Sequence, residues 1–175
     1  MEASQFYDAE QHMLESDDPN EVRQAEAILR ERDAAHPDDA LVQFLIASAF
    51  DASDREAEAM VHYRRAFKIG VDTLPPERRP ELYLQAGSTL RNLGQLDEAR
   101  DLLTEGVSVF PEFRALEAFL ALVEVSAGND SGAVNHLLAL LTRDDEGDES
   151  LRHYRRALTW YAQQIAEQTT KGPAD

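Results

Sequence analysis

Apolar and small residues recur three or four positions apart on both sides of Gly94, which is the spacing of two amphipathic helices joined by a short break. Glycine readily adopts the left-handed conformation that ends a helix, so Gly94 predicts the end of the first one. The positions that carry the pattern are Tyr83, Ala86, Gly87, Leu90, Ala99, Leu103, Gly106 and Pro111. Because several of them are small, the two helices can approach closely, and residues 81–111 predict a tight helical hairpin.

The second helix of this hairpin recurs along the chain. The first alanine of this helix, Ala99, has counterparts at Ala25, Ala59 and Ala133. Successive alanines are 34, 40 and 34 residues apart. The longer separation is explained by an insertion in 70–80. In the same frame the alanines are followed by Leu29, Arg32 and Pro37; by Tyr63, Ala66 and Val71; by Leu103, Gly106 and Pro111; and by Leu137, Leu140 and Asp145. We expect four repeats, at about 6–39, 40–79, 80–113 and 114–147.

This order of aromatic, small and proline positions resembles the tetratricopeptide repeat, a helix–turn–helix unit with a period of about 34 residues. The resemblance implies an all-α fold, an α–α superhelix in which hairpins stack as a right-handed solenoid. We expect one domain over 1–168, closed by a capping helix at about 150–168, and a disordered tail at 169–175. The ending also resembles small bacterial proteins made of a few such repeats and a basic, aromatic terminal helix.

Capping patterns mark two of the expected helix starts. Asp18 precedes a proline, so we expect it to cap a helix that begins at Pro19. Ser53 and Glu56 have the spacing of a capping box, in which each side chain bonds a backbone amide at the helix start. Gly128, like Gly94, is expected to separate two helices.

Acidic residues dominate the surface chemistry. The 175 residues contain 34 Asp and Glu against 17 Lys and Arg, which gives a net charge of −17. Residues 1–39 alone hold twelve acidic and three basic side chains. Because such a surface repels phosphate backbones, nucleic-acid binding is disfavoured. The acidic N-terminal repeats have two interpretations: they attract a basic partner, or they are a solvated surface that keeps the protein soluble.

Membrane and secretion signals are missing from the sequence. No apolar run approaches the ~18–20 residues of a membrane span, and the N-terminus lacks the basic-then-apolar layout of a signal peptide. There is no cysteine, which excludes disulfides, thiol catalysis and cysteine-ligated zinc. We therefore expect a cytoplasmic protein that does not bind membranes.

The sequence offers no catalytic or metal-binding constellation. None of the five histidines has another histidine four residues away, as a zinc-binding helical pair requires. The acidic segment 144–149 lacks the spacing of a calcium-binding loop, because its twelfth position is Arg155 rather than glutamate. Neither a glycine-rich phosphate loop nor a Gly-x-Ser-x-Gly elbow occurs. We expect no enzymatic activity, no cofactor and no metal.

In the tetratricopeptide family the first helix of each repeat lines a concave groove where peptides or partner proteins bind. By register, the resemblance implies as groove residues Tyr7, Glu10 and Leu14; Leu41, Phe44 and Ser48; Leu84, Ser88 and Arg91; and Ala118 and Leu122. Segment 40–50 is apolar nearly all round, so we expect it to make contacts on more than one face. For Leu41 and Phe44 two interpretations stay open, cover by a partner and burial against neighbouring helices.

One subgroup of the family does not fit. Members that bind the C-terminal carboxylates of chaperones carry lysine, asparagine and arginine along the groove. The matching positions here are Glu10, Leu14, Leu45, Glu81 and Gln85. Leucine and glutamate donate no hydrogen bond to a carboxylate, and the glutamates would repel it.

The last expected helix repeats a pentapeptide found earlier in the chain. His-Tyr-Arg-Arg-Ala stands at 62–66 and again at 153–157. Its apolar stripe comprises Leu151, Tyr154, Leu158, Tyr161 and Ile165. This stripe either caps the open end of the array or lies in the groove. Trp160 is on the opposite side, where it is either an interface anchor or is stacked on Arg156 or covered by the tail.

The function that these features favour is a non-enzymatic scaffold that binds a protein or peptide in its groove. Two alternatives stay open. The first is a self-associating structural protein that forms a homodimer, and the second is a regulatory subunit or chaperone of an enzyme.

Overall fold

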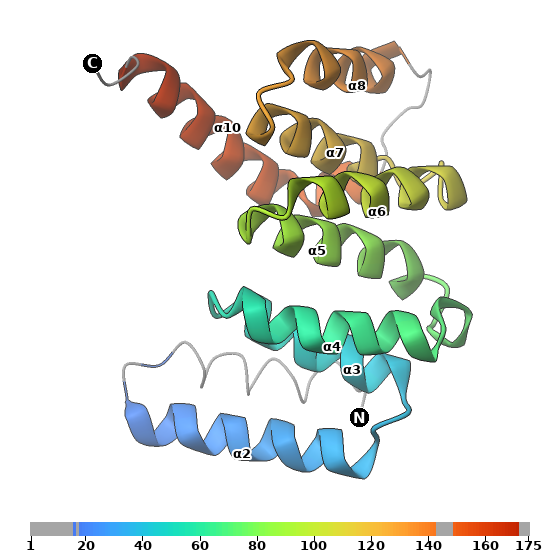
Figure 1. Ribbon diagram of the computed structural model, residues 1–175, viewed down its shortest axis with the longest axis vertical. Coiled ribbons are helices and arrows are strands. Elements are labelled where there is room, and N and C mark those ends of the chain that lie inside the picture. The colour runs from blue at the N-terminus through green and yellow to red at the C-terminus, as the bar shows by residue number, and fades with distance from the viewer. Residues whose placement is uncertain (1–15, 17, 143–148, 172–175) are drawn as a thin grey trace. The chain divides into compact units, whose positions relative to one another are not determined.

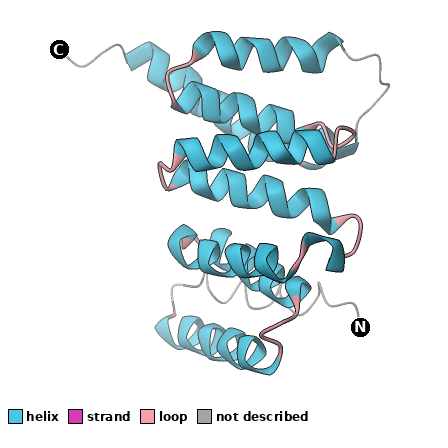
Figure 2. Cartoon of the chain, turned by 45° about the vertical axis from the view of Figure 1, so that its right-hand side comes forward, coloured by secondary structure: helices cyan, strands magenta, loops and turns pink. Residues whose placement is uncertain are grey.

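Helices make up the regular structure of the computed structural model, which describes residues 16, 18–142 and 149–171, and no strand occurs among these residues (Figures 1 and 2). The predicted all-α class is confirmed. Contacts divide the chain into two units, Met1–Ala99 and Arg100–Asp175, with the boundary inside helix α6 (Leu96–Val109). The single domain expected over 1–168 stays a prediction.

Two α-helices fall in each of the three later repeats. The remaining elements in chain order are α2 (Pro19–Ala35), α3 (Ala40–Asp51), α4 (Glu56–Ile69), the 3-10 helix η1 (Val71–Thr73), α5 (Arg78–Asn92), α7 (Ala115–Ser126), α8 (Asp130–Thr142), α9 (Glu149–His153) and α10 (Arg155–Lys171). Helix α2 is the second helix of the first expected repeat. The pairs α3 and α4, α5 and α6, and α7 and α8 correspond to the later repeats.

Aspartates cap the first two of these helices. The Asp18 carboxylate accepts a hydrogen bond from the Asn20 amide at 2.8 Å, and Pro19 occupies the first helical position, as predicted. Asp39 does the same for α3, because it accepts from the Leu41 and Val42 amides at 2.9 and 3.2 Å. Asp39 was not among the predicted caps.

The predicted capping box at Ser53 and Glu56 is wrong. The Ser53 hydroxyl donates to a carbonyl of the preceding helix at 2.8 Å, and α4 begins at Glu56 with no side-chain cap. The segment instead ends α3. Asp54 has a φ of 56°, in the left-handed region, and the Arg55 amide donates to the Phe50 carbonyl at 3.0 Å.

The same turn ends the first helix of the next two repeats. Gly94 and Gly128 both have a φ of 74°, and in each case the following amide bonds the carbonyl five residues earlier at 2.9 Å. The two predicted glycine helix ends are thus confirmed. Asp54, Gly94 and Gly128 are separated by 40 and 34 residues, as are the repeat alanines. Asp54 therefore occupies a position that glycine fills in the next two repeats.

The core of the first unit follows the repeat frame. Ala25, Ala59 and Ala99 are each 0% exposed, which lets neighbouring backbones approach. Helix α3 packs on α2, α4 and α5, and most of its residues are buried. The predicted contacts of segment 40–50 on several faces are therefore confirmed.

The insertion between α4 and α5 is an ordered connection. It contains η1, followed by Leu74, which is buried. The Arg79 guanidinium donates to the Leu74 carbonyl at 3.0 Å and to the Asp72 carbonyl at 2.8 Å. One apolar anchor and one arginine therefore hold the additional residues on the first unit.

In the second unit α7 packs on α8, and the apolar stripe of α9 and α10 packs on α7. The Tyr154 ring lies 5.6 Å from that of Phe119, and the Tyr161 ring lies 6.0 Å from it. The expected single helix at 150–168 is divided at Tyr154, and α10 continues to Lys171, beyond the predicted end. The repeated pentapeptide thus has two local structures, since its first copy lies within α4.

Helix α8 departs from the repeat frame on one face. Leu137 is 47% exposed, whereas its frame equivalents Leu29, Tyr63 and Leu103 are buried. Val134 and Leu138 are exposed beside it. The last helix packs on α7, so this face of α8 is left to solvent among the described residues.

Candidate functional site

A polar network joins the first helices of two consecutive repeats, α3 and α5. The Ser48 hydroxyl donates to Gln85 Oε1 at 2.7 Å, and the Tyr63 hydroxyl donates to the same oxygen at 2.9 Å. Both bonds end on the oxygen, so in the part of the chain that the structure describes the amide N–H groups of Gln85 have no partner. Gln85 and Ser48 are half-buried, and this face therefore offers hydrogen-bond donors.

The structure places the predicted groove residues at different depths. Phe44 and Leu84 are 1% exposed and Ala118 is 6% exposed, so their side chains lie in the interior. The half-buried members are Leu41, Ser48, Ser88, Arg91 and Leu122. Residues Tyr7, Glu10 and Leu14 lie outside the described residues. Binding by any of them stays a prediction.

A carboxyl group lies at the C-terminal end of α3, next to this network. The Thr89 hydroxyl donates to Asp51 Oδ1 at 2.7 Å. Burial raises the pKa of Asp51 to about 6, and the charges of Glu56 and Asp54 act in the same direction, although the bond from Thr89 opposes them. A carboxylate at a helix C-terminus also meets the negative end of the helix dipole. This group therefore changes charge at a pH well above that of an ordinary aspartate.

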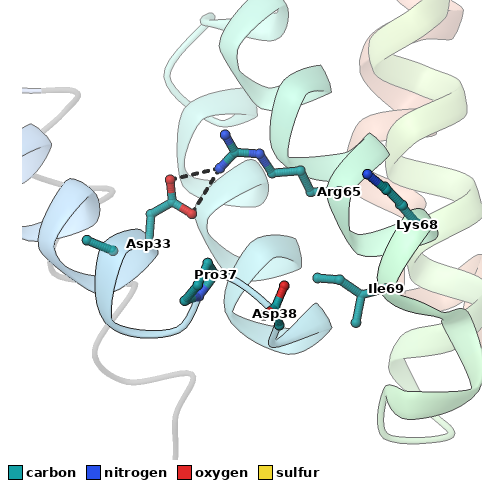
Figure 3. Close-up of a pocket in the computed structure, with 7 residues that line it drawn as sticks. Asp33, Pro37, Asp38, Arg65, Lys68 and Ile69 are labelled. Atoms are coloured by element: carbon teal, nitrogen blue, oxygen red, sulfur yellow. Dashed lines mark hydrogen bonds and ion pairs between the residues drawn. The ribbon is translucent and has the colours of Figure 1, made fainter.

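An open hollow of about 640 Å³ lies between the end of α2 and the last turns of α4 (Figure 3). Its lining comprises Asp33, Ala34, Pro37, Asp38, Arg65, Lys68 and Ile69. Arg65 donates to both carboxylate oxygens of Asp33, at 3.0 and 2.8 Å. Lys68 and Asp38 have no partner among the described residues. The hollow therefore carries both charge signs and favours no single class of ion.

The polar side chains behind this hollow form hydrogen bonds with one another. Gln43 donates to Asp33 at 2.7 Å, and its carbonyl oxygen lies 2.8 Å from His62 Nδ1. Burial alone would raise the pKa of Asp33, but the bonds from Gln43 and Arg65 lower it. Burial also lowers the pKa of His62. Because these side chains pair with each other across α2, α3 and α4, their role is structural.

The second unit holds buried charges on α7. The Glu124 carboxylate is buried, with 4% of the residue exposed, and it accepts from Arg100 Nε at 2.6 Å and from the side-chain amide of Asn129 at 2.6 Å. The bond from Arg100 holds the pKa of Glu124 below its usual value, against the effect of burial. Glu117, also buried, lies 3.7 Å from His136 Nδ1. This group links α6, α7 and α8.

Trp160 of α10 is 54% exposed. Its ring touches that of the neighbouring Tyr161, with the centroids 5.0 Å apart. It lies in an open hollow of about 350 Å³ whose other lining residues are Arg155, Arg156, Thr159 and Gln163. The structure gives no stacking of Arg156 on this ring among the described residues. Its role as an interface anchor stays a prediction.

The structure combines three features: paired helices, glycines that end the first helices of two repeats, and buried alanines that recur at the repeat spacing. A family model described as a tetratrico peptide repeat matches residues 40–165, which is more than half of the chain. The chain belongs to the tetratricopeptide repeat family. A search of curated proteins finds no match.

Tetratricopeptide repeat proteins are generally non-enzymatic scaffolds that bind protein partners, so membership of the family supports the predicted protein-interaction scaffold. Binding in the groove stays a prediction. No described helix has the length and apolarity that crossing a membrane requires. No three histidine or carboxylate side chains among the described residues are grouped as a metal site would need. The expected absence of a metal, a cofactor and catalysis stays a prediction.

Neither Gln85, in the α3–α5 network, nor the neighbouring Asp51 was predicted as a functional residue. In the sequence, Gln85 was noted only because its position does not carry the residue of the subgroup that binds chaperone carboxylates. Its contacts to Ser48 and Tyr63 span 37 and 22 residues, so no local pattern indicates them. The available signal was the repeat frame itself, which places polar residues of α5 beside those of α3.

Proposed function

We propose that this tetratricopeptide repeat protein is a non-enzymatic adaptor that binds a protein or peptide segment on the face formed by α3 and α5. The observation that supports it is the half-buried network of Ser48 and Gln85, in which the Gln85 amide retains donors for a ligand carbonyl. Ser88 and Arg91 follow Gln85 at one and two helical turns. Phe44 and Leu84 support this face from below, because they are buried.

The partner we favour is a basic segment. The chain has a net charge of −17, and an opposite charge raises the rate of association and suppresses acidic competitors. The same charge disfavours nucleic acid. A cytoplasmic location is part of this proposal and rests on the sequence alone.

A matched pair of serine substitutions tests the binding face. Ser88→Arg adds bulk and positive charge on α5, whereas Ser108→Arg makes the same change at an exposed position of α6. In pull-downs from the native host, we expect Ser88→Arg to reduce recovery of bound proteins at least about 10-fold and Ser108→Arg to leave it unchanged. Circular dichroism of both variants checks that they are folded. Equal recovery by the wild type and Ser88→Arg contradicts the proposed face.

Self-association is a second candidate, which the exposed apolar face of α8 favours. Val134, Leu137 and Leu138 are between 47 and 52% exposed, and adjacent apolar side chains of this kind mark interaction sites. We expect the wild type to be a dimer by light scattering at micromolar concentration and Leu137→Glu to be a monomer. A monomeric wild type excludes this candidate.

A further inference from the structure

The two copies of the pentapeptide His-Tyr-Arg-Arg-Ala differ in the partners of their arginines. In α4, Arg64 donates to both carboxylate oxygens of Glu98 at 3.0 and 2.9 Å. Arg65 donates to both oxygens of Asp33 at 3.0 and 2.8 Å. Asp33 is in α2 and Glu98 is in α6, so each arginine is paired by the second helix of a neighbouring repeat.

The second copy places Arg155 and Arg156 at the first two positions of α10, and neither has a partner among the described residues. No acidic residue occurs in the first turn of this helix. The positive end of the helix dipole therefore adds to the charge of the two guanidinium groups. The two arginines of the first copy thus pair with carboxylates, whereas those of the second copy have no carboxylate partner among the described residues.

The face of α10 that carries these arginines is the one that does not pack against α7. The apolar stripe faces α7 through Tyr154 and Tyr161, while Arg155, Arg156 and Trp160 line the open hollow of about 350 Å³. Trp160 is 54% exposed, and its ring meets that of Tyr161 edge-on, with an interplanar angle of 71°.

We propose that this surface of Arg155, Arg156 and Trp160, the α10 surface, binds an acidic protein segment that carries an apolar residue. Two carboxylates of the segment occupy the positions that Asp33 and Glu98 hold relative to the first pentapeptide copy, and the apolar side chain covers Trp160. Arginine forks pair bidentately with carboxylates, and tryptophan and arginine dominate the binding energy of many interfaces. This proposal goes beyond the α3–α5 face, which lies in the other unit and favours the opposite charge.

A short fluorescein-labelled peptide of glutamates around one central leucine tests the proposal by fluorescence anisotropy. We expect binding that weakens as salt is added, because the charges are exposed. Arg155→Ala/Arg156→Ala and Trp160→Ala should each weaken binding about 10-fold or more. The control Arg23→Ala/Arg30→Ala removes the same charge from exposed positions of α2 and should leave binding unchanged.

A charge reversal separates loss of the surface from loss of the fold. Arg155→Glu/Arg156→Glu should lose the glutamate peptide and gain affinity for the same peptide with lysine in place of glutamate. Failure of the wild type to bind the glutamate peptide, or equal weakening by the α2 control, overturns the proposal. Preference for a thymine oligonucleotide of equal charge assigns the surface to nucleic acid and overturns it as well. A salt-sensitive dimer abolished by Trp160→Ala, without peptide binding, makes the occupant a second copy and also overturns it.

Discussion

At the scale of single residues, the left-handed position that ends the first helix of a repeat shows how one side chain affects stability. In the part of the chain that the structure describes, glycine occupies it twice, and Asp54 occupies it once with a φ of 56°. A side chain with a β-carbon is strained there, although aspartate tolerates the conformation better than most residues. A β-carbon added at Gly94 would meet no atom within 4 Å, so only the backbone would oppose a substitution.

We expect Asp54→Gly to raise the free energy of unfolding by about 0.5–1 kcal/mol, and Gly94→Ala to lower it by about 1–2 kcal/mol. The physical reason is the same backbone strain, removed in one variant and introduced in the other. Urea unfolding followed by circular dichroism measures both. The control is Asp38→Gly, at a position outside the left-handed turns, which should not raise the free energy of unfolding. If Asp54→Gly is destabilising, the turn is held by the aspartate side chain rather than by backbone geometry.

Asp51 gives a pH-dependent prediction. Because its pKa in the folded protein is about 6 and the usual value is 3.8, its contribution to stability is fully present below about pH 4 and is lost as the pH rises through about 6. Asp51→Asn keeps an acceptor for Thr89 and removes the charge. The variant should therefore be more stable than the wild type at pH 8, by up to about 3 kcal/mol, and no more stable at pH 4.

Urea unfolding of the wild type and Asp51→Asn across that pH range measures the difference directly. Comparing the two proteins at each pH cancels the titration of all other groups. A difference that stays constant from pH 4 to pH 8 would show that Asp51 is not the group responsible.

At the scale of helices, the stability lost when one partner of an ion pair is removed depends on how deeply the pair is buried. Arg100 of α6 pairs with the buried Glu124 of α7, whereas Arg30 and Glu26 pair on the surface of α2, with the Arg30 side chain 75% exposed. Removing one partner of a buried pair leaves a charge without compensation, while an exposed pair contributes little. The loss of the arginine is therefore expected to cost far more stability at the α6–α7 pair than at the α2 pair.

We expect Arg100→Ala to lower the free energy of unfolding by about 2–3 kcal/mol, somewhat moderated because Asn129 still donates to Glu124. Arg30→Ala, the control, should cost less than about 0.5 kcal/mol. The loss in Arg100→Ala should shrink as the pH falls below the usual pKa of glutamate, because a protonated Glu124 no longer needs the arginine. Denaturant unfolding at neutral and acidic pH measures this. Equal losses in both variants would contradict the buried pairing.

The sequence predicted which helices exist better than how their polar groups pair. The alanine frame and the glycines identify α3 to α8 because small residues and helix ends are local requirements. The bonds of Gln85 and the partners of Glu124 join different helices, and no periodicity indicates them. The wrong prediction around Asp54 has a physical reason: serine, aspartate and glutamate are typical of a helix start, whereas here the aspartate replaces a glycine at a helix end.

At the scale of the whole molecule, the net charge of −17 opposes folding through repulsion between like charges. Exposed ion pairs such as Arg64–Glu98 act in the other direction, but each contributes less than about 1 kcal/mol. Salt screens both effects. Because acidic residues outnumber Lys and Arg by 34 to 17, most of the repulsion has no compensating pair.

We therefore expect added salt to stabilise the protein. Raising NaCl from ~10 mM to ~200 mM shortens the screening length from about 30 Å to below 10 Å and should increase Tm by about 2–4 °C, which corresponds to about 1 kcal/mol. Differential scanning fluorimetry at constant pH measures the shift, and KCl should reproduce it if screening rather than a specific ion is responsible. A Tm that falls with salt would mean that the arginine–carboxylate pairs between repeats outweigh the repulsion.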